Sequence, residues 1–160
     1  MNKRIILVGP TASGKTFLRN RFEDKGFECD VSYTTRPMRP GEKDGVHYHF
    51  LEVKIFEEMI KEGGFYEWVE YNGNYYGTGL EEWESLPLFI METDGVKHIT
   101  LEDRKSCFII YINPAKVIRQ TRMVLERGWT MEEVDKRLKT DRDKFEGFSD
   151  YDLILTDPEF

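Results

Sequence analysis

Cysteine is scarce in this sequence. Only two of its 160 residues are cysteines, Cys29 and Cys107. Two cysteines do not make a disulfide framework, and this pair lacks the spacing of a metal-binding motif. We therefore expect two reduced thiols and exclude a small secreted fold held together by disulfides.

Long apolar runs and an excess of basic residues are also lacking. No run approaches the length of a membrane span, and the four apolar residues after Arg4 are too few for the core of a signal peptide. Acidic residues outnumber basic ones by 30 to 23, so the net charge is −7 and non-specific binding along nucleic acid is not expected. These absences predict a cytoplasmic protein that binds neither membrane nor nucleic acid, and no feature indicates an obligate protein partner.

The composition is otherwise that of an ordinary globular domain. Apolar residues make up 39% of the chain and charged residues 33%, which excludes a disordered chain. A length of 160 residues suits one compact domain with one core.

The first thirty residues have the pattern of an α/β fold. Residues 5–8 form a short, β-branched apolar run that stops at Gly9, as a buried parallel strand does. Residues 14–24 predict a helix, and residues 27–31 predict a second strand. The order of strand, glycine-rich turn, helix and strand is typical of an α/β protein.

The next segment, residues 32–78, has a different character. It begins with a loop rich in turn-forming residues, continues with a predicted helix at 52–63, and then alternates over residues 65–71. The dipeptide Asn72-Gly73 after this alternation is a strong hairpin signal. The segment therefore predicts a small, partly antiparallel insertion.

The parallel pattern resumes after the insertion. Predicted strands at 86–91 and 107–112 are followed by helices at 115–127 and 130–146, and by a last short strand at 152–155. The second helix opens with Thr130 and Glu133 in the spacing of a capping box.

The turn after the first strand matches the phosphate-binding pattern G-x-x-x-x-G-K-[ST]. Its glycines allow backbone amides to curl around phosphate oxygens, and the helix that follows points its positive N-terminal end at the same anion. Lys15 supplies a mobile charge for the β- and γ-phosphates, and the Thr16 hydroxyl is placed to bind Mg²⁺. The motif predicts a nucleoside triphosphate site made of Gly9, Pro10, Thr11, Ala12, Ser13, Gly14, Lys15 and Thr16.

A second candidate site follows in the insertion. Arg36 and Arg39 lie three residues apart on a loop that prolines stiffen, and two guanidinium groups held in this way suit a monophosphate. Tyr48 and Tyr76 are candidates to donate hydroxyl protons or to stack on a base. From these residues alone, a solvated surface loop remains the alternative.

Two long stretches of the insertion resemble the signature of the guanylate kinase family. The first is Ser32-Tyr33-Thr34-Thr35-Arg36-Pro37-x-Arg39-x-Gly41-Glu42-x-Asp44-Gly45-x-x-Tyr48-x-Phe50, and the second is Phe65-x-Glu67-Trp68-x-Glu70-x-x-Gly73-Asn74-Tyr75-Tyr76-Gly77-Thr78. Together with the phosphate-binding motif they cover most of residues 4–156, and the likeness is weaker after residue 80.

The resemblance implies a transfer of the γ-phosphoryl group of ATP to GMP, with dGMP as a further acceptor and Mg²⁺ as cofactor. It implies a P-loop kinase fold, which is a mostly parallel sheet flanked by helices. The core would comprise residues 1–31, 79–114 and 144–160, the GMP-binding lobe residues 32–78, and a helical lid residues 115–143. A kinase for another small phosphorylated acceptor and an inactive protein-binding module are the alternatives.

The resemblance also assigns roles to individual residues. Lys15, Arg36, Arg127 and Arg137 would be catalytic. The GMP phosphate would be held by Arg36, Arg39, Tyr48 and Tyr76, and the guanine would be surrounded by Ser32, Glu67, Thr78 and Asp94. A carboxylate such as Glu67 can accept both guanine donors, N1–H and the exocyclic amine. Glu92 is either a group near Mg²⁺ or a solvated strand end, and Arg119 and Arg122 belong either to the lid chemistry or to a solvated helix face.

Overall fold

The fold is built on a four-stranded parallel sheet, sheet A. A computed structural model describes residues 3–157 of the chain, so the ends of the predicted core, residues 1–2 and 158–160, lie outside the described residues. The strand order is β6-β1-β7-β8 and every neighbouring pair is parallel. The strands are β1 (Arg4–Val8), β6 (Leu88–Ile90), β7 (Cys107–Ile112) and β8 (Leu153–Leu155).

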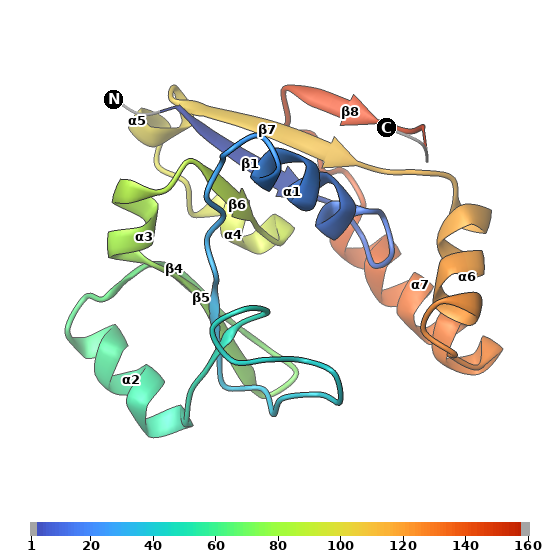
Figure 1. Ribbon diagram of the computed structural model, residues 1–160, viewed down its shortest axis with the longest axis horizontal. Coiled ribbons are helices and arrows are strands. Elements are labelled where there is room, and N and C mark those ends of the chain that lie inside the picture. Colours follow the sequence, from blue (N-terminus) through green and yellow to red (C-terminus); the bar gives the residue numbers. More distant parts are fainter. Residues whose placement is uncertain (1–2, 158–160) are drawn as a thin grey trace.

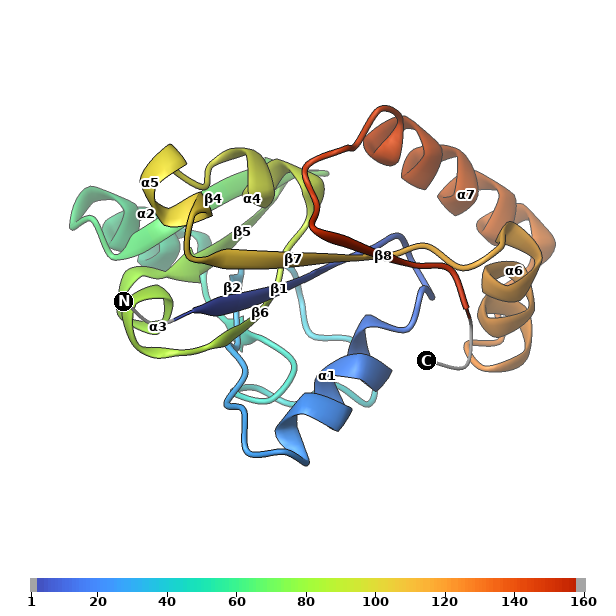
Figure 2. The same ribbon diagram turned by 90° about the horizontal axis from the view of Figure 1, so that it is seen from above.

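Both faces of sheet A are covered, as the continuous apolar strands require. Leu7, Leu88 and Ile110 face α1 (Lys15–Glu23), whose Leu18 and Phe22 pack against them. Figure 2 shows α1 on one side of the sheet and α4 (Thr93–Lys97) and α7 (Met131–Phe145) on the other. The predicted α/β class, a parallel sheet flanked by helices, is confirmed.

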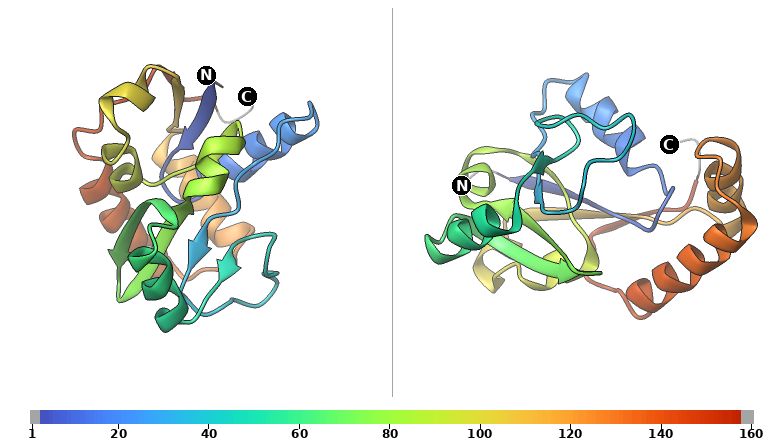
Figure 3. Two further views of the ribbon diagram at one scale, coloured as in Figure 1. Left: turned by 90° about the vertical axis from the view of Figure 1, so that its left-hand side faces the viewer. Right: turned by 90° about the horizontal axis from the view of Figure 1, so that it is seen from below.

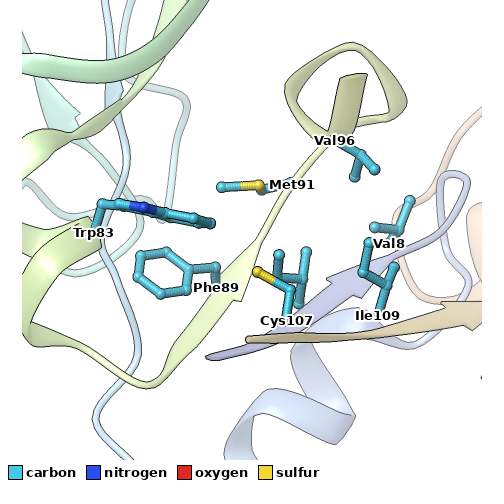
Figure 4. Packing of buried hydrophobic residues seen from close by; sticks show 8 residues of the cluster. Val8, Trp83, Phe89, Met91, Val96, Cys107 and Ile109 are labelled. Atoms are coloured by element: carbon cyan, nitrogen blue, oxygen red, sulfur yellow. The ribbon is translucent and has the colours of Figure 1, made fainter. Parts of the chain in front are cut away.

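The second face of the sheet carries the larger core cluster. Val8 and Ile109 from the central strands meet Phe89, Met91 and Trp83 (Figure 4). Trp83 comes from α3 (Leu80–Ser85), a helix that the sequence pattern did not indicate. The Arg4 guanidinium lies 4.4 Å from the centre of the Trp83 ring, and its Nε donates to the Trp83 carbonyl at 2.7 Å.

A second sheet, sheet B, belongs to the inserted segment. Its order is β3-β2-β5-β4, and its β4–β5 pair is an antiparallel hairpin that turns at Asn72 and Gly73, both with positive φ. In the right-hand view of Figure 3, α2 (Val53–Lys61) and sheet B lie at one end of the molecule and the α6–α7 pair at the other. The strands are β2 (Tyr33–Thr34), β3 (His49–Phe50), β4 (Phe65–Tyr71) and β5 (Asn74–Gly79).

Two helices, α6 (Lys116–Leu125) and α7, form a hairpin beside the phosphate-binding turn (Figure 1). Met123, Val134 and Leu138 make a small apolar cluster between them. The Thr130 side chain accepts from the Glu133 backbone while Glu133 accepts from the Thr130 backbone, so the predicted capping box is confirmed.

One predicted strand is wrong. Residues 27–31 form no strand, and their contact with sheet A is an isolated bridge from Cys29 to Leu88. The reason is that the chain leaves sheet A after Asp30 and enters sheet B at Tyr33, so too few residues run beside β6 to form a ladder. A last short helix, α5 (Leu101–Arg104), precedes β7. None of the described helices is long and apolar enough to cross a membrane.

Candidate active site

The phosphate-binding turn has the backbone shape that its sequence predicts. Gly9 follows β1 directly and lies so close to its neighbours that a Cβ there would be 2.5 Å from the Ile112 carbonyl and 2.6 Å from Ser13 Oγ. Gly14 has a φ of 107°, which side-chain-bearing residues rarely adopt, and α1 begins directly after it. The turn therefore wraps around the N-terminus of α1, where a phosphate is favoured.

A cavity of about 480 Å³ opens over this turn. It is lined by six loop and helix residues from Thr11 to Thr16 together with Phe17, Tyr48, Glu92, Arg122, Glu126, Arg127 and Arg137. Eight of these side chains, four cationic and four hydroxylic, are groups of the kind that hold phosphate oxygens. The cavity is large enough for the phosphates of a nucleotide.

Lys15 is turned back onto its own loop. Its Nζ donates to the Gly9 carbonyl and, at 3.1 Å, to the Pro10 carbonyl. Burial lowers the pKa of Lys15, whereas the nearby carboxylates of Glu92 and Asp141 raise it. An anion in the cavity would favour the charged amine further, so the site is suited to a polyphosphate.

The α6–α7 hairpin is tied to the loop by buried polar contacts. The Asp141 carboxylate accepts from the Thr11 backbone and hydroxyl and pairs with Arg119. Arg119 Nε also donates to the Thr11 carbonyl at 2.8 Å. Arg119, which the sequence left open, is thus a buried structural residue, 8% exposed, and not part of a solvated face.

Two further arginines of the hairpin reach the loop itself. Arg122 donates to the carbonyls of Ala12 and Ser13, both at 3.1 Å, and lines the cavity. Arg137 donates to the Thr11 hydroxyl and lines the same cavity. The structure therefore brings Arg122 to the phosphate region as well as the expected Arg127 and Arg137.

The residues that we expect to hold the acceptor gather on sheet B and its loop. The Arg36 guanidinium is held by Glu42 through two hydrogen bonds of 3.0 and 2.8 Å and lies 5.5 Å from the Tyr48 ring centre. The Tyr48 and Tyr76 rings are 6.2 Å apart. Arg39 is exposed on the same loop, where its backbone nitrogen donates to Glu42. Arg36 is thus pre-oriented beside both tyrosines.

A second, smaller cavity lies between sheet B and the end of β6. It is lined by Ser32, Tyr48, Glu67, Val69, Tyr76, Gly77, Thr78, Ile90, Met91, Glu92 and Gly95. Glu67 is 8% exposed, and its Oε1 accepts from the Thr78 hydroxyl at 2.7 Å. Burial raises the pKa of Glu67, and the bond from Thr78 acts in the opposite direction. A Cβ on Gly95 would lie 3.4 Å from the Glu67 carboxyl group. The glycine therefore leaves space beside this carboxyl group.

Asp94 is the one predicted guanine residue that the structure does not bring to this cavity. It lies in α4, and its carboxylate pairs with Lys97 at 2.8 Å with the side chain 47% exposed. Glu92, at the end of β6, lines both cavities instead. The acidic group between the two sites is therefore Glu92, because the chain turns into α4 directly after it and carries Asp94 to the outer side.

The cavity offers few protein ligands for Mg²⁺, and this ion usually needs only one or two. Within residues 3–157, no three His, Cys, Asp or Glu side chains are grouped so as to hold a metal. Thr16 and Glu92 offer a hydroxyl and a carboxylate on one cavity. Mg²⁺ usually keeps several waters and takes one or two protein groups plus substrate phosphates, so these residues fit the ion.

The family model and the relatives that match this chain have the same description. The family model described as guanylate kinase matches residues 1–160. A guanylate kinase from Alkalilimnicola ehrlichii is 32% identical over 97% of this chain and 80% of its own length. One from Listeria innocua is 35% identical over 94% of this chain and 78% of its own length.

The fold has a solved counterpart. The crystal structure of guanylate kinase from Anaplasma phagocytophilum superimposes with a TM-score of 0.73 at 24% sequence identity. The match covers 99% of this chain and 79% of that one. At this identity the likeness supports the fold.

Proposed function

The chain belongs to the guanylate kinase family, and we propose that it transfers the γ-phosphoryl group of ATP to GMP at the junction of its two cavities, giving ADP and GDP. One observation carries the residue-level proposal: Tyr48 and Glu92 line both the phosphate cavity and the cavity that contains Glu67. A nucleoside triphosphate on the loop and a monophosphate on sheet B would therefore meet at these two residues. Both substrates are cytoplasmic nucleotides, which favours the cytoplasm as the location of the protein.

The donor would lie on the phosphate-binding turn. Backbone amides of the turn and the N-terminus of α1 would hold its β-phosphate. Lys15 would release the carbonyls of Gly9 and Pro10 and move to the β- and γ-phosphates. Arg127 and Arg137 would neutralise charge on the transferring group, and Arg122 joins them because it lines the same cavity.

The acceptor would lie on sheet B. Arg36 and Arg39 would hold the GMP phosphate with help from the hydroxyls of Tyr48 and Tyr76, and Glu42 would keep the Arg36 fork in place. Glu67 would accept from N1–H and the 2-amine of guanine, with Ser32 and Thr78 on the same cavity.

The chemistry needs no nucleophile from the protein. In-line phosphoryl transfer depends on positioning and on charge neutralisation, and the residues above supply both. When bound beside Thr16 and Glu92, Mg²⁺ would add positive charge near the phosphates. Closure of residues 32–78 and 115–143 over the core would exclude water and limit hydrolysis of ATP.

A coupled assay with ATP, Mg²⁺ and a panel of monophosphates tests this function. We expect turnover with GMP, weaker or equal turnover with dGMP, and little with AMP, CMP or UMP. Equal use of all acceptors would favour a kinase of different specificity. A folded protein without turnover on any acceptor would favour a binding module, against which the intact Lys15 and Thr16 of the loop argue.

A further inference from the structure

Asp30 is a buried acid that the proposed reaction does not use. It lies where the chain passes from sheet A to sheet B, and its backbone nitrogen donates to the Leu88 carbonyl at 2.8 Å. The residue is 5% exposed. Its Oδ2 accepts from the Ser32 hydroxyl at 2.8 Å, and its Oδ1 has no hydrogen-bond partner among the described residues. A buried carboxylate with an oxygen unpaired is costly, which favours the neutral acid.

The charges around Asp30 also favour its neutral form. Glu82 of α3 and Glu67 of β4 repel a negative charge there, and Arg19 of α1 attracts one. Burial is the largest effect and, together with the two glutamates, raises the pKa of Asp30 to about 7 against the opposing hydrogen bond from Ser32. The titratable neighbours in sequence, Cys29 and Tyr33, both have raised pKa values and stay uncharged near neutral pH.

The protonation state of Asp30 decides what Ser32 can do. An ionised carboxylate only accepts hydrogen bonds, so the Ser32 hydroxyl must donate its proton to the hydrogen bond with Asp30. A neutral acid can donate to Ser32 Oγ, which leaves the hydroxyl proton available elsewhere. Ser32 lines the same small cavity as Glu67. If Glu67 takes the two donors of guanine, the base still presents O6, an acceptor that needs a donor.

We propose that Asp30 is a positioning residue for base selection: as a neutral acid it donates to Ser32 Oγ and thereby directs the Ser32 hydroxyl proton to O6 of guanine. The inference rests on the proposed function, since it requires guanine in the cavity lined by Ser32 and Glu67. Loss of the Asp30 proton turns the Ser32 hydroxyl back towards Asp30, and O6 then faces an oxygen lone pair.

The test is the pH dependence of the KM for GMP. Between about pH 6.5 and 8.5, the KM of the wild type should rise roughly fivefold to tenfold, the effect of one hydrogen bond, while kcat at saturating GMP changes little. The GMP phosphate ionises with a pKa of about 6, so it contributes little to a step in this range. Asp30→Asn keeps a permanent N–H donor to Ser32 and should have a low, flat KM.

Two further variants complete the test. Asp24→Asn removes a carboxylate at an exposed position near the end of α1 and should keep the wild-type step. Ser32→Ala should have a raised KM without the step, and it decides the matter if Asp30→Asn does not fold. A step that persists in Asp30→Asn or in Ser32→Ala would overturn the role of Asp30. Absence of GMP turnover by the wild type at every pH would instead overturn the proposed function.

Discussion

The carboxylate of Asp141 in α7 accepts hydrogen bonds from both the backbone nitrogen and the hydroxyl of Thr11, at 3.0 and 3.1 Å, although the residues lie 130 positions apart. The same carboxylate pairs with Arg119 of α6. Asp141 is 3% exposed and Arg119 is 8% exposed. A buried ion pair between α6 and α7 therefore holds both helices against the phosphate-binding turn.

Removal of Asp141 should therefore destabilise the fold. Asp141→Ala leaves the Arg119 guanidinium buried without its partner, which typically costs about 3–5 kcal/mol of the free energy of unfolding. Urea unfolding of the two proteins measures the difference. Asp143→Ala, at an exposed position of the same helix, is the matched control and should change little. An Asp141→Ala protein as stable as the control would show that the pair contributes no net stability.

Arg122 should behave differently from Arg119. Its guanidinium contacts two loop carbonyls and lines the phosphate cavity, and the residue is only partly buried. Arg122→Ala should lower kcat/KM for ATP by roughly tenfold to a hundredfold, the usual effect of losing one charged phosphate contact. Thermal unfolding should shift far less than in Arg119→Ala. A large loss of stability with normal kinetics would make Arg122 a structural residue too.

Local signals in the sequence explain what could be predicted. The phosphate-binding turn, the hairpin at Asn72-Gly73 and the capping box at Thr130 each depend on a few neighbouring residues, and each is present in the structure. The place of Arg119 depends on Asp141 and on Thr11, which lies 108 positions away, so no local pattern reveals it.

Glu92 and Asp94 show a second limit of prediction from the sequence. The helix α4 has only five residues, which is too short for a helical period to be visible in the sequence. Without that helix, Glu92 and Asp94 both look like acids at a strand end. Once the chain turns at Thr93, Glu92 stays at the edge of the two cavities and Asp94 pairs with Lys97 on the surface.

Lys15 gives the sharpest test of the phosphate-binding turn. Lys15→Ala should lower kcat by roughly a hundredfold to a thousandfold, because the lost charge acts on the transferring phosphoryl group. Circular dichroism should show an unchanged fold. Lys25→Ala, at an exposed position beyond α1, is the matched control and should turn over normally. Near-normal turnover of folded Lys15→Ala would remove the turn from the mechanism.

The stability of the protein should depend on pH through Asp30. The pKa of Asp30 is about 7 in the folded state, against 3.8 for an ordinary aspartate in water. Between these values the folded state holds a proton that the unfolded state has lost, so this group makes stability fall as pH rises from about 4 to 7. Asp30→Asn should be no more stable than the wild type near pH 4 but more stable at pH 8. Urea unfolding at both pH values measures this, and an equal difference at both would contradict it.

The last prediction concerns base choice and rests on Glu67. Guanine presents two donors, N1–H and the 2-amine, whereas adenine has an acceptor at N1 and no 2-amine. Glu67 is buried, its Oε1 accepts from Thr78, and it lines the small cavity. An adenine in this cavity would place the lone pair of its N1 against the carboxylate. The wild type should therefore prefer GMP over AMP by roughly 10⁴-fold in kcat/KM.

Glu67→Gln replaces one acceptor with a donor and should lower kcat/KM for GMP by roughly a hundredfold, mainly through KM. Glu70→Gln, at an exposed position of the same strand, should leave it near the wild-type value. The decisive measurement is kcat/KM for GMP and AMP on the three proteins. Indifference of GMP use to Glu67→Gln would place the guanine edge elsewhere, because the side-chain amide has one acceptor oxygen and an NH₂ donor where the carboxylate has two acceptor oxygens.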